Sequence, residues 1–184
     1  MPARRVPVRI LPGCRGRVTG AELRRVARYV LNAEGVAPGV EVEVVLADAA
    51  TVRGLSRLYG GRDEPTDVLS FASGEEAPRK PARPEALEEP ALSLSKGRGP
   101  VFIEPPDAAP SLGEVVICLP VAEAQAQAAG RPVAGAVAHL LVHGLLHLLG
   151  YDHEASETDA ARMREREEAL LWVLGYEGAY KHGH

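Results

Sequence analysis

Four of the chain's six histidines stand close together in an apolar stretch, at His139, His143, His147 and His153. Two side chains four residues apart on a helix project from one face about one turn apart, so His143 and His147 can both direct a ring nitrogen to one ion. Gly150 then permits a sharp turn, because glycine tolerates backbone angles that strain other residues. Such a turn returns His153 to the same point. We therefore predict that His143, His147 and His153 hold one metal ion.

His139 is also four residues from His143, but it does not suit the same ion. On an ideal helix His139 and His147 are about 12 Å apart along the axis and rotated by about 80°, so one ion cannot serve both. The pair His143 and His147 lies nearer the turn and is the better choice. We expect His139 to support the site or the core. The imidazoles of His143, His147 and His153 also need a shared partner, because burying them without one would cost about 1–3 kcal/mol for each unsatisfied nitrogen.

Neutral imidazoles without a thiolate favour Zn²⁺, although other divalent transition metals remain possible. Three protein ligands leave one position open, as in catalytic zinc sites, whereas structural sites normally have four ligands. Water at an open position can lose a proton near neutral pH and act as a nucleophile. The histidine spacing thus predicts a metal-dependent hydrolase with one zinc ion.

The residue after His143 bears on what is hydrolysed. The spacing H-x3-H-x2-G-x2-H is shared with zinc proteases of the type H-E-x-x-H-x-x-G-x-x-H, in which the glutamate is the general base. Here that position is Gly144. Glycine cannot transfer a proton, which disfavours a protease. A phosphodiester makes less demand for such a base, because a metal ion and basic residues can stabilise its anionic transition state.

The charge of the chain is unevenly distributed. The net charge is −4, yet residues 1–66 contain eleven arginines against seven acidic residues, and residues 113–184 contain ten acidic against five basic residues. A polyanion would be attracted to the N-terminal half, although solvated helix faces of mixed sign explain the same charges equally well. Two distant cysteines suit a reducing cytosol, and no apolar run approaches about 18 residues. We expect a cytoplasmic protein that does not contact a membrane.

The histidine stretch must be positioned by the rest of the chain. Apolar patterns predict strands at 6–11, 40–47, 66–72 and 113–119, and helices at 19–35, 49–59, 119–130, 133–150 and 156–174. Thr19 and Glu22 have the spacing of a capping box. Strands interleaved with helices indicate an α/β or α+β fold. We expect one domain over 1–184, with a central mixed sheet of about four strands packed by helices.

One segment shows neither helical nor strand periodicity. Residues 73–111 hold eight of the fifteen prolines. A loop of this length is unusual inside a compact domain, so we interpret it as an insertion that joins two strands of the sheet. The sequence assigns it no role.

Three segments together resemble a known family. They are "HLLVHGLLHLLGYDH" at 139–153, "YGGRDEPTDVLSF" at 59–71 and "LGEVVICL" at 112–119. The stretch from about Val40 to Tyr180, without the insertion, is similar to the YbeY family of bacterial endoribonucleases and rRNA maturation factors. The resemblance implies one α/β domain with a single zinc held by the three histidines. It also implies cleavage of single-stranded RNA, maturation of the 16S rRNA 3′ end on the small ribosomal subunit, and ribosome quality control, with no action on DNA.

The chain departs from the family pattern near Tyr59. The family has an arginine after this tyrosine, thought to hold or polarise RNA, whereas this chain has Gly60. Arg62 is the candidate catalytic residue that can supply the charge instead, although an arginine at the tip of a turn is by default solvated. The loss motivates an alternative function, that of a ribosome assembly factor with a stabilising zinc and little catalysis. A metalloprotease is less favoured still.

Other residues match or nearly match the family. Thr66, Asp67 and Ser70 fit its "TDVLSF" segment, and we interpret them as turn and strand residues, with Thr66 or Asp67 hydrogen-bonding the local backbone. Glu114 replaces an aspartate of the family. Asp152 either orients a histidine ligand or caps its own loop.

Overall fold

The computed structural model of the chain describes residues 5–60, 63, 65–73, 110–154 and 156–176. Its four strands form one sheet in the order β1-β2-β4-β3 and are Val8–Ile10 (β1), Glu41–Ala47 (β2), Val68–Ala72 (β3) and Ser111–Cys118 (β4). Strands β1, β2 and β4 are parallel, and β3 runs antiparallel to β4 at one edge. The predicted α/β fold with a mixed four-stranded sheet is confirmed.

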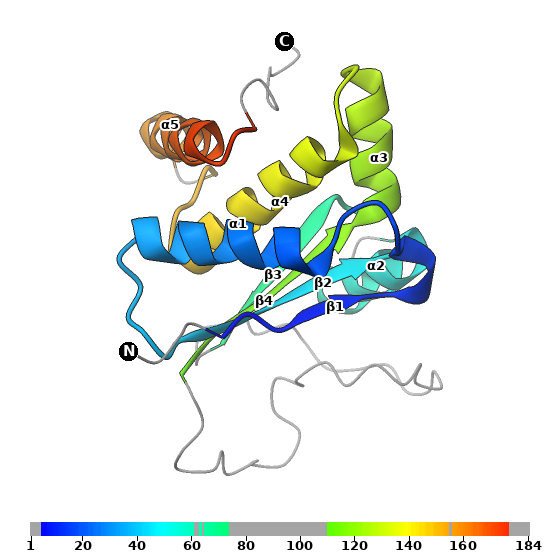
Figure 1. Cartoon of the computed structure of the whole chain (residues 1–184), viewed down its shortest axis with the longest axis horizontal. Helices are drawn as coiled ribbons and strands as arrows, with labels where there is room; N and C mark the ends of the chain where they lie inside the picture. The colour runs from blue at the N-terminus through cyan, green and yellow to red at the C-terminus, as the bar shows by residue number, and fades with distance from the viewer. Residues whose placement is uncertain (1–4, 61–62, 64, 74–109, 155, 177–184) are drawn as a thin grey trace.

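Within the described residues, five α-helices pack around the sheet (Figure 1). They are Gly20–Ala33 (α1), Ala49–Leu55 (α2), Leu119–Ala128 (α3), Val133–Leu148 (α4) and Glu157–Val173 (α5). Helices α1 and α4 cover one face of the sheet, and α5 packs on α4. Helix α2 lies on the opposite face, where Val52 and Leu55 contact Val116 and Cys118. The main core therefore lies between the sheet and α1, α4 and α5.

The start of α1 shows how the local sequence sets an element. The Thr19 backbone N–H donates to Glu22 Oε2 at 2.7 Å, and the Glu22 N–H donates to Thr19 Oγ1 at 3.2 Å. This is the predicted capping box, which satisfies two backbone donors at once. The helix buries one apolar stripe, made of Leu23, Val26, Ala27, Val30 and Leu31. These contacts hold α1 against α4 and the sheet.

Several boundaries differ from the sequence prediction by a few residues, and two of the differences have a clear structural description. The predicted helix 49–59 ends as an α-helix at Leu55 and continues as one π-helical turn, Ser56–Gly60. Strand β4 starts at Ser111, inside the predicted insertion, because the Ser73 N–H donates to the Leu112 carbonyl across the β3–β4 pair. The insertion does join two neighbouring strands, as expected. Residues 74–109 lie outside the described part of the chain.

Helix α4 approaches the sheet unusually closely at Gly144. A Cβ added at this position would lie 2.7 Å from Val115 Cγ1, closer than real Cβ atoms come to other atoms, and 3.0 Å from Ser70 Oγ, which is an unusually tight contact. Only glycine allows this contact without movement of the neighbours. The turn of α4 that carries His143 and His147 is thereby seated directly on β3 and β4.

Both cysteines, Cys14 and Cys118, are buried free thiols. Within the described residues, none of the helices combines the length and the apolar character needed to span a membrane.

Candidate metal centre

Three histidines converge where α4 ends. His143 and His147 lie one turn apart on α4, and Gly150, with φ of 90°, turns the chain so that His153 returns beside them. The ring centroids are 4.6 Å apart for His143 and His147, 5.3 Å for His143 and His153, and 5.0 Å for His147 and His153. One ring nitrogen from each lies within 4.8 Å of the others. The structure thus brings together the three histidines named from the sequence.

The spacing of these nitrogens suits a metal ion. His143 Nε2 and His147 Nε2 are 3.1 Å apart. Two nitrogens bound to one zinc at about 2.0–2.1 Å with a tetrahedral angle would be about 3.3 Å apart. The group comprises three residues, and among the described part of the chain no Cys, Asp or Glu joins it. His153 is exposed and the other two are half-buried, so solvent reaches the group from one side.

The environment keeps His147 neutral. Burial lowers the pKa of His147, and the nearby His143 and His153 rings lower it further. A hydrogen bond with the Tyr151 backbone and the charge of Asp152 act in the opposite direction but are weaker. Because a neutral imidazole is the form that binds a metal, the lowered pKa of His147 favours the state needed for coordination.

A buried carboxylate stands behind His143. Glu167, on α5, is 5% exposed, and its Oε1 lies 2.6 Å from His143 Nδ1. Its Oε2 lies 3.6 Å from Nε2 of His139, which is 7% exposed. Burial raises the pKa of Glu167, but the adjacent His139 and His143 rings outweigh it and bring the pKa to about 2. Glu167 is therefore an ionised acceptor inside the core.

Glu167 was not predicted from the sequence, although a signal for it is present. Glu167 lies four residues after Met163 and three before Leu170, on the buried stripe of α5. An acidic side chain in the middle of an apolar stripe requires a polar partner. His139 and His143 are those partners, and the contact with Glu167 explains why a histidine is buried at position 139, outside the three-histidine group.

The turn between His147 and His153 is tied to α1 and α5. The Tyr151 hydroxyl donates to Glu34 Oε2 at 3.0 Å, and Arg166 Nε donates to the other oxygen of Glu34. Asp152 Oδ1 accepts a hydrogen bond of 2.8 Å from the Glu154 N–H. Of the two roles considered for Asp152, loop capping is therefore the one that its contacts show.

Thr66 and Asp67 make the expected local contacts, and Asp67 Oδ2 also accepts a hydrogen bond of 3.2 Å from Gln125 Nε2 on α3. Asp67 Oδ1 accepts from the Val68 N–H at 2.9 Å and from Thr66 Oγ1 at 3.2 Å. The Ser70 hydroxyl reaches further and donates to the Gly144 carbonyl at 3.1 Å. Gly60 ends the π-helical turn. Arg62, the predicted catalytic residue, lies outside the described residues.

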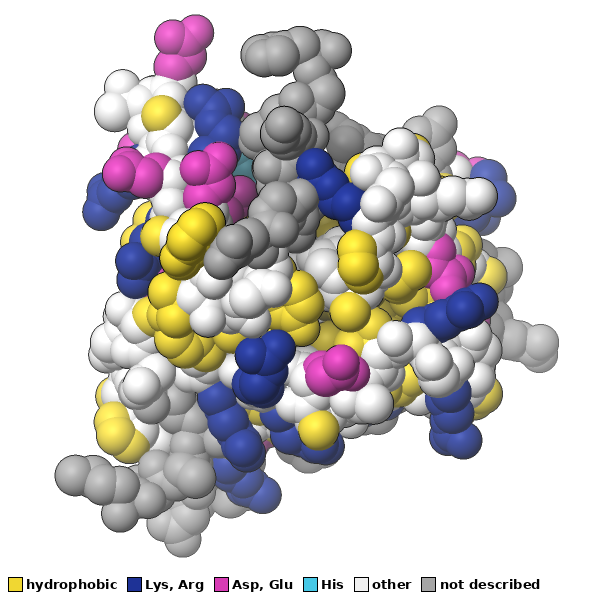
Figure 2. Space-filling model, turned by 45° about the horizontal axis from the view of Figure 1, so that its top comes forward, with side chains coloured by type: hydrophobic (Ala, Val, Ile, Leu, Met, Phe, Trp, Pro, Cys, Tyr) yellow, Lys and Arg dark blue, Asp and Glu magenta, His cyan; other side chains and the backbone are white. Residues whose placement is uncertain are grey.

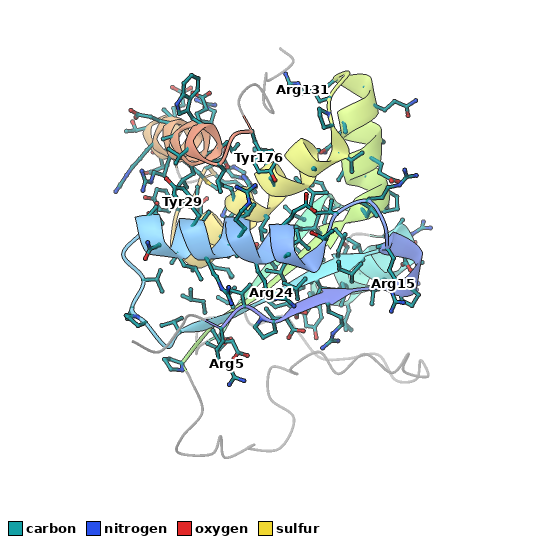
Figure 3. All side chains as sticks on the ribbon, in the orientation of Figure 1. Arg5, Arg15, Arg24, Tyr29, Arg131 and Tyr176 are labelled. Carbon is teal, nitrogen blue, oxygen red and sulfur yellow. The ribbon has the colours of Figure 1, made fainter. Side chains whose placement is uncertain are left out.

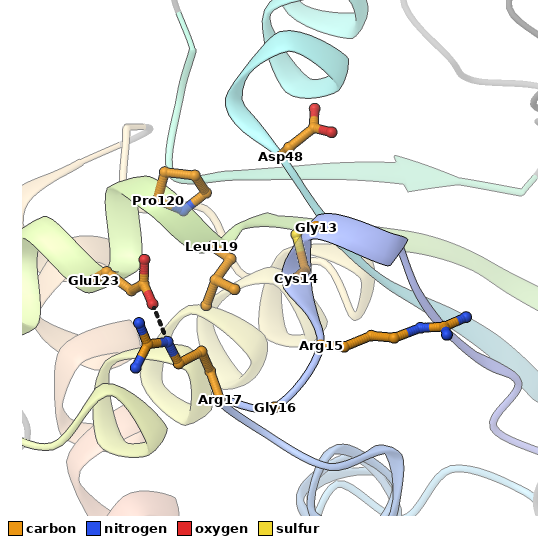
Figure 4. A pocket seen from close by; sticks show the side chains of 9 residues that line it. All are labelled: Gly13, Cys14, Arg15, Gly16, Arg17, Asp48, Leu119, Pro120 and Glu123. Atoms are coloured by element: carbon orange, nitrogen blue, oxygen red, sulfur yellow. Dashed lines mark ion pairs between the residues drawn. The ribbon is translucent and has the colours of Figure 1, made fainter.

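A separate pocket of about 370 Å³ lies where the parallel strands end (Figure 4). It is lined by the loop 13–17, by Asp48 at the start of α2, and by the first residues of α3. An ion pair of 2.8 Å between Arg17 Nε and Glu123 Oε1 forms one wall. The pocket lining contains none of the histidines at 139–153, so this pocket is distinct from the metal centre.

The charge asymmetry of the sequence is also spatial. Figure 2 shows mostly Lys and Arg side chains over the lower part of one face, whereas most of the acidic side chains lie at its upper left, interspersed with Lys and Arg. Figure 3 places Arg5, Arg15 and Arg24 on the side of β1 and α1. Exposed acidic side chains of α5 include Glu157, Asp159, Glu165 and Glu168. A polyanion approaching the molecule would be attracted to the β1 and α1 side.

Comparison with known proteins identifies the family. A family model described as "Endoribonuclease YbeY" matches residues 17–175. This chain belongs to the YbeY family. Among its curated relatives, "Endoribonuclease YbeY" of Roseiflexus sp. (strain RS-1) is 38% identical over 172 residues, which cover 94% of each chain. "Endoribonuclease YbeY" of Moorella thermoacetica is 40% identical over 153 residues, covering 83% of this chain and 85% of the relative.

A solved structure supports the fold independently. The solution structure of TM1509 from Thermotoga maritima covers 96% of both chains with a TM-score of 0.51 at 20% identity. The YbeY family is metal-dependent, and in this member the three-histidine group can bind a metal ion.

Proposed function

We propose that this protein is a zinc-dependent endoribonuclease that cleaves single-stranded RNA, with His143, His147 and His153 as the zinc ligands. The observation that carries the proposal is the convergence of three ring nitrogens, open to solvent on one side, in a member of the YbeY family. Curated relatives of similar length bear the name endoribonuclease. An imidazole-only donor set with a position left for water suits zinc best.

Different residues of the protein have different roles around the ion. When bound, zinc supplies Lewis acidity that activates water and offsets the charge of a phosphodiester. His147 is held neutral by burial and by its neighbours, so its lone pair is available. His153 is exposed, and in our proposal the RNA strand approaches the ion from this side. In our proposal Arg62, two positions after Gly60, supplies the positive charge that holds the RNA phosphate.

The geometry argues against a protease. A side chain at position 144 would meet Val115 and Ser70 on the sheet, so this position faces β3 and β4. A glutamate could not be placed here as the general base of a zinc protease without moving the side chains of Val115 and Ser70. Phosphodiester cleavage does not need that residue.

The biological setting follows from the family resemblance. We propose that the substrate is ribosomal RNA, that cleavage matures the 3′ end of 16S rRNA on the small ribosomal subunit, and that the protein acts in the cytoplasm. The basic β1 and α1 side suits a negatively charged partner.

The test is a cleavage assay on matched RNAs. The zinc-loaded chain should cleave a labelled single-stranded RNA and leave the same sequence intact in a duplex. His147→Ala should lose bound zinc and reduce cleavage at least 100-fold, whereas Gln127→Ala, an exposed residue of α3, should change neither. Retention of both zinc and cleavage by His147→Ala would refute the proposal.

A second candidate function is that of a ribosome assembly factor with a stabilising zinc. It is motivated by Gly60, which stands where the family has an arginine. This alternative predicts very weak cleavage by the natural chain and a large gain in Gly60→Arg. Robust cleavage by the natural chain, unchanged in Gly60→Arg, would reject it.

A further inference from the structure

Glu167 is a buried carboxylate that contacts His143, and apolar packing alone does not explain its position. The side chain is 5% exposed and lies on the stripe of α5 that also buries Met163, Leu170 and Leu171. Burying a carboxylate in such surroundings is costly unless its oxygens are satisfied. The Oε1 atom meets His143 Nδ1 at 2.6 Å, a short distance typical of a charge-assisted hydrogen bond.

This contact determines which nitrogen of His143 carries the proton. A carboxyl group is ordinarily a stronger acid than an imidazolium, so in this 2.6 Å contact the proton lies on the ring, and His143 Nδ1 is the donor. The Nε2 atom is then left with its lone pair, and it lies 3.1 Å from His147 Nε2, on the side where the three histidines converge. Glu167 thus selects the tautomer of His143 that can bind an ion at the shared point.

The three histidines differ in how they are held. His147 is held by the backbone of Tyr151, within the same turn of chain. His143 is held by a side chain 24 residues away, on a different helix. Its ring orientation therefore depends on the docking of α5 against α4.

We propose that Glu167 is a positioning residue of the metal centre: it fixes the tautomer and ring orientation of His143, and so sets the affinity for the metal. Buried His139 faces the second oxygen of the same carboxylate, with its Nε2 3.6 Å from Oε2. Partners behind a metal-ligating histidine typically change metal affinity by 10- to 100-fold when removed. The statement about affinity rests on the proposed metal site, whereas the statement about the tautomer does not.

The test uses Glu167→Leu, which removes the acceptor, and Glu167→Gln, which keeps an oxygen but loses the charge. The matched control is Glu168→Gln, an exposed change at the next residue of α5. In metal-free protein at pH 8, long-range ¹H–¹⁵N spectra of the rings should show His143 protonated at Nδ1 in the natural chain and in the control. Glu167→Leu should shift this proton towards Nε2, and Glu167→Gln should give an intermediate result.

Zinc affinity is then measured by competition with a chromophoric chelator. We expect Glu167→Leu to weaken binding 10- to 100-fold, Glu167→Gln to weaken it less, and Glu168→Gln to leave it unchanged. If Glu167→Leu does not fold, the same two measurements on Glu167→Gln decide the matter. A Glu167 variant with natural zinc affinity and His143 still protonated only at Nδ1 would overturn the inference. A natural chain that binds no zinc would instead refute the proposed metal site and leave the tautomer measurement standing.

Discussion

The hydroxyl of Ser70 on β3 donates a hydrogen bond of 3.1 Å to the carbonyl oxygen of Gly144 on α4. The bond exists because Gly144 has no side chain, which lets the helix descend onto the strand. The donor lies on the edge strand β3, and the acceptor lies next to His143. One contact therefore fixes the height of the helical turn that carries two of the three histidines.

A methyl group at position 144 should destabilise the fold. Gly144→Ala places Cβ 2.7 Å from Val115 Cγ1, and overpacking of this kind typically costs about 1–3 kcal/mol, partly offset by about 1 kcal/mol of helix propensity. We expect a lower free energy of unfolding in urea. Gly54→Ala on α2 is the matched control, because a Cβ there meets nothing within 4 Å, and it should be neutral or stabilising. Equal effects of the two substitutions would contradict the packing argument.

Stability should depend on pH through Glu114, which lies away from the metal centre. Burial and the neighbouring Glu43 raise the pKa of Glu114 from 4.5 to about 7, while Arg9 acts in the opposite direction. The folded protein therefore holds this proton more tightly than the unfolded chain. The stabilising contribution is complete below pH 4.5 and is lost as the pH rises through 7.

Glu114→Gln should remove this dependence. The variant is expected to match the natural chain near pH 5 and to exceed its free energy of unfolding at pH 8 by roughly 1 kcal/mol, since solvent screens a partly exposed group. Urea denaturation at the two pH values measures the difference. If the natural chain and the variant have the same free energy of unfolding at pH 8, the raised pKa of Glu114 is contradicted.

The anchor of the turn at Tyr151 should contribute to stability. Tyr151→Phe removes the hydrogen bond to Glu34 and should lower the free energy of unfolding by about 1 kcal/mol. Tyr59→Phe is the control, because Tyr59 is 44% exposed and its ring packs edge-on against Phe71. The comparison is made by thermal denaturation of metal-free protein, so that zinc does not mask it. Equal melting temperatures of Tyr151→Phe and Tyr59→Phe would show that the hydrogen bond from Tyr151 to Glu34 does not contribute to stability.

RNA binding should weaken steeply as salt rises. Each phosphate contact releases counterions, and the logarithm of the binding constant of a single strand falls with a slope of about −0.7 per contact against the logarithm of salt concentration. Fluorescence anisotropy with a labelled single-stranded RNA gives the slope, and an uncharged-backbone analogue of the same sequence is the control. A flat response for the natural RNA would point to a protein partner.

Local patterns predicted most of the fold because each signal acts over a few residues. The Thr19–Glu22 box and the turn at Gly150 depend on neighbours in the sequence and were confirmed. The strand order and the start of β4 at Ser111 depend on pairing across the sheet, which no short window contains.

The candidate site shows the same division. His143, His147 and His153 could be named because their spacing follows the helix and one turn. Glu167 could not be paired with His143, because its partner comes from another helix and the docking of α5 on α4 is a long-range property. The sequence showed only that an acid interrupts an apolar stripe.

The central claim is that one ion is held by three imidazoles with a position left open. Anomalous diffraction at the zinc edge, on crystals of the zinc-loaded protein, tests it most directly. We predict a single strong peak about 2.0–2.1 Å from one ring nitrogen each of His143, His147 and His153, with no fourth protein ligand. A peak elsewhere in the molecule, or one whose fourth position is closed by a side chain, would contradict the account.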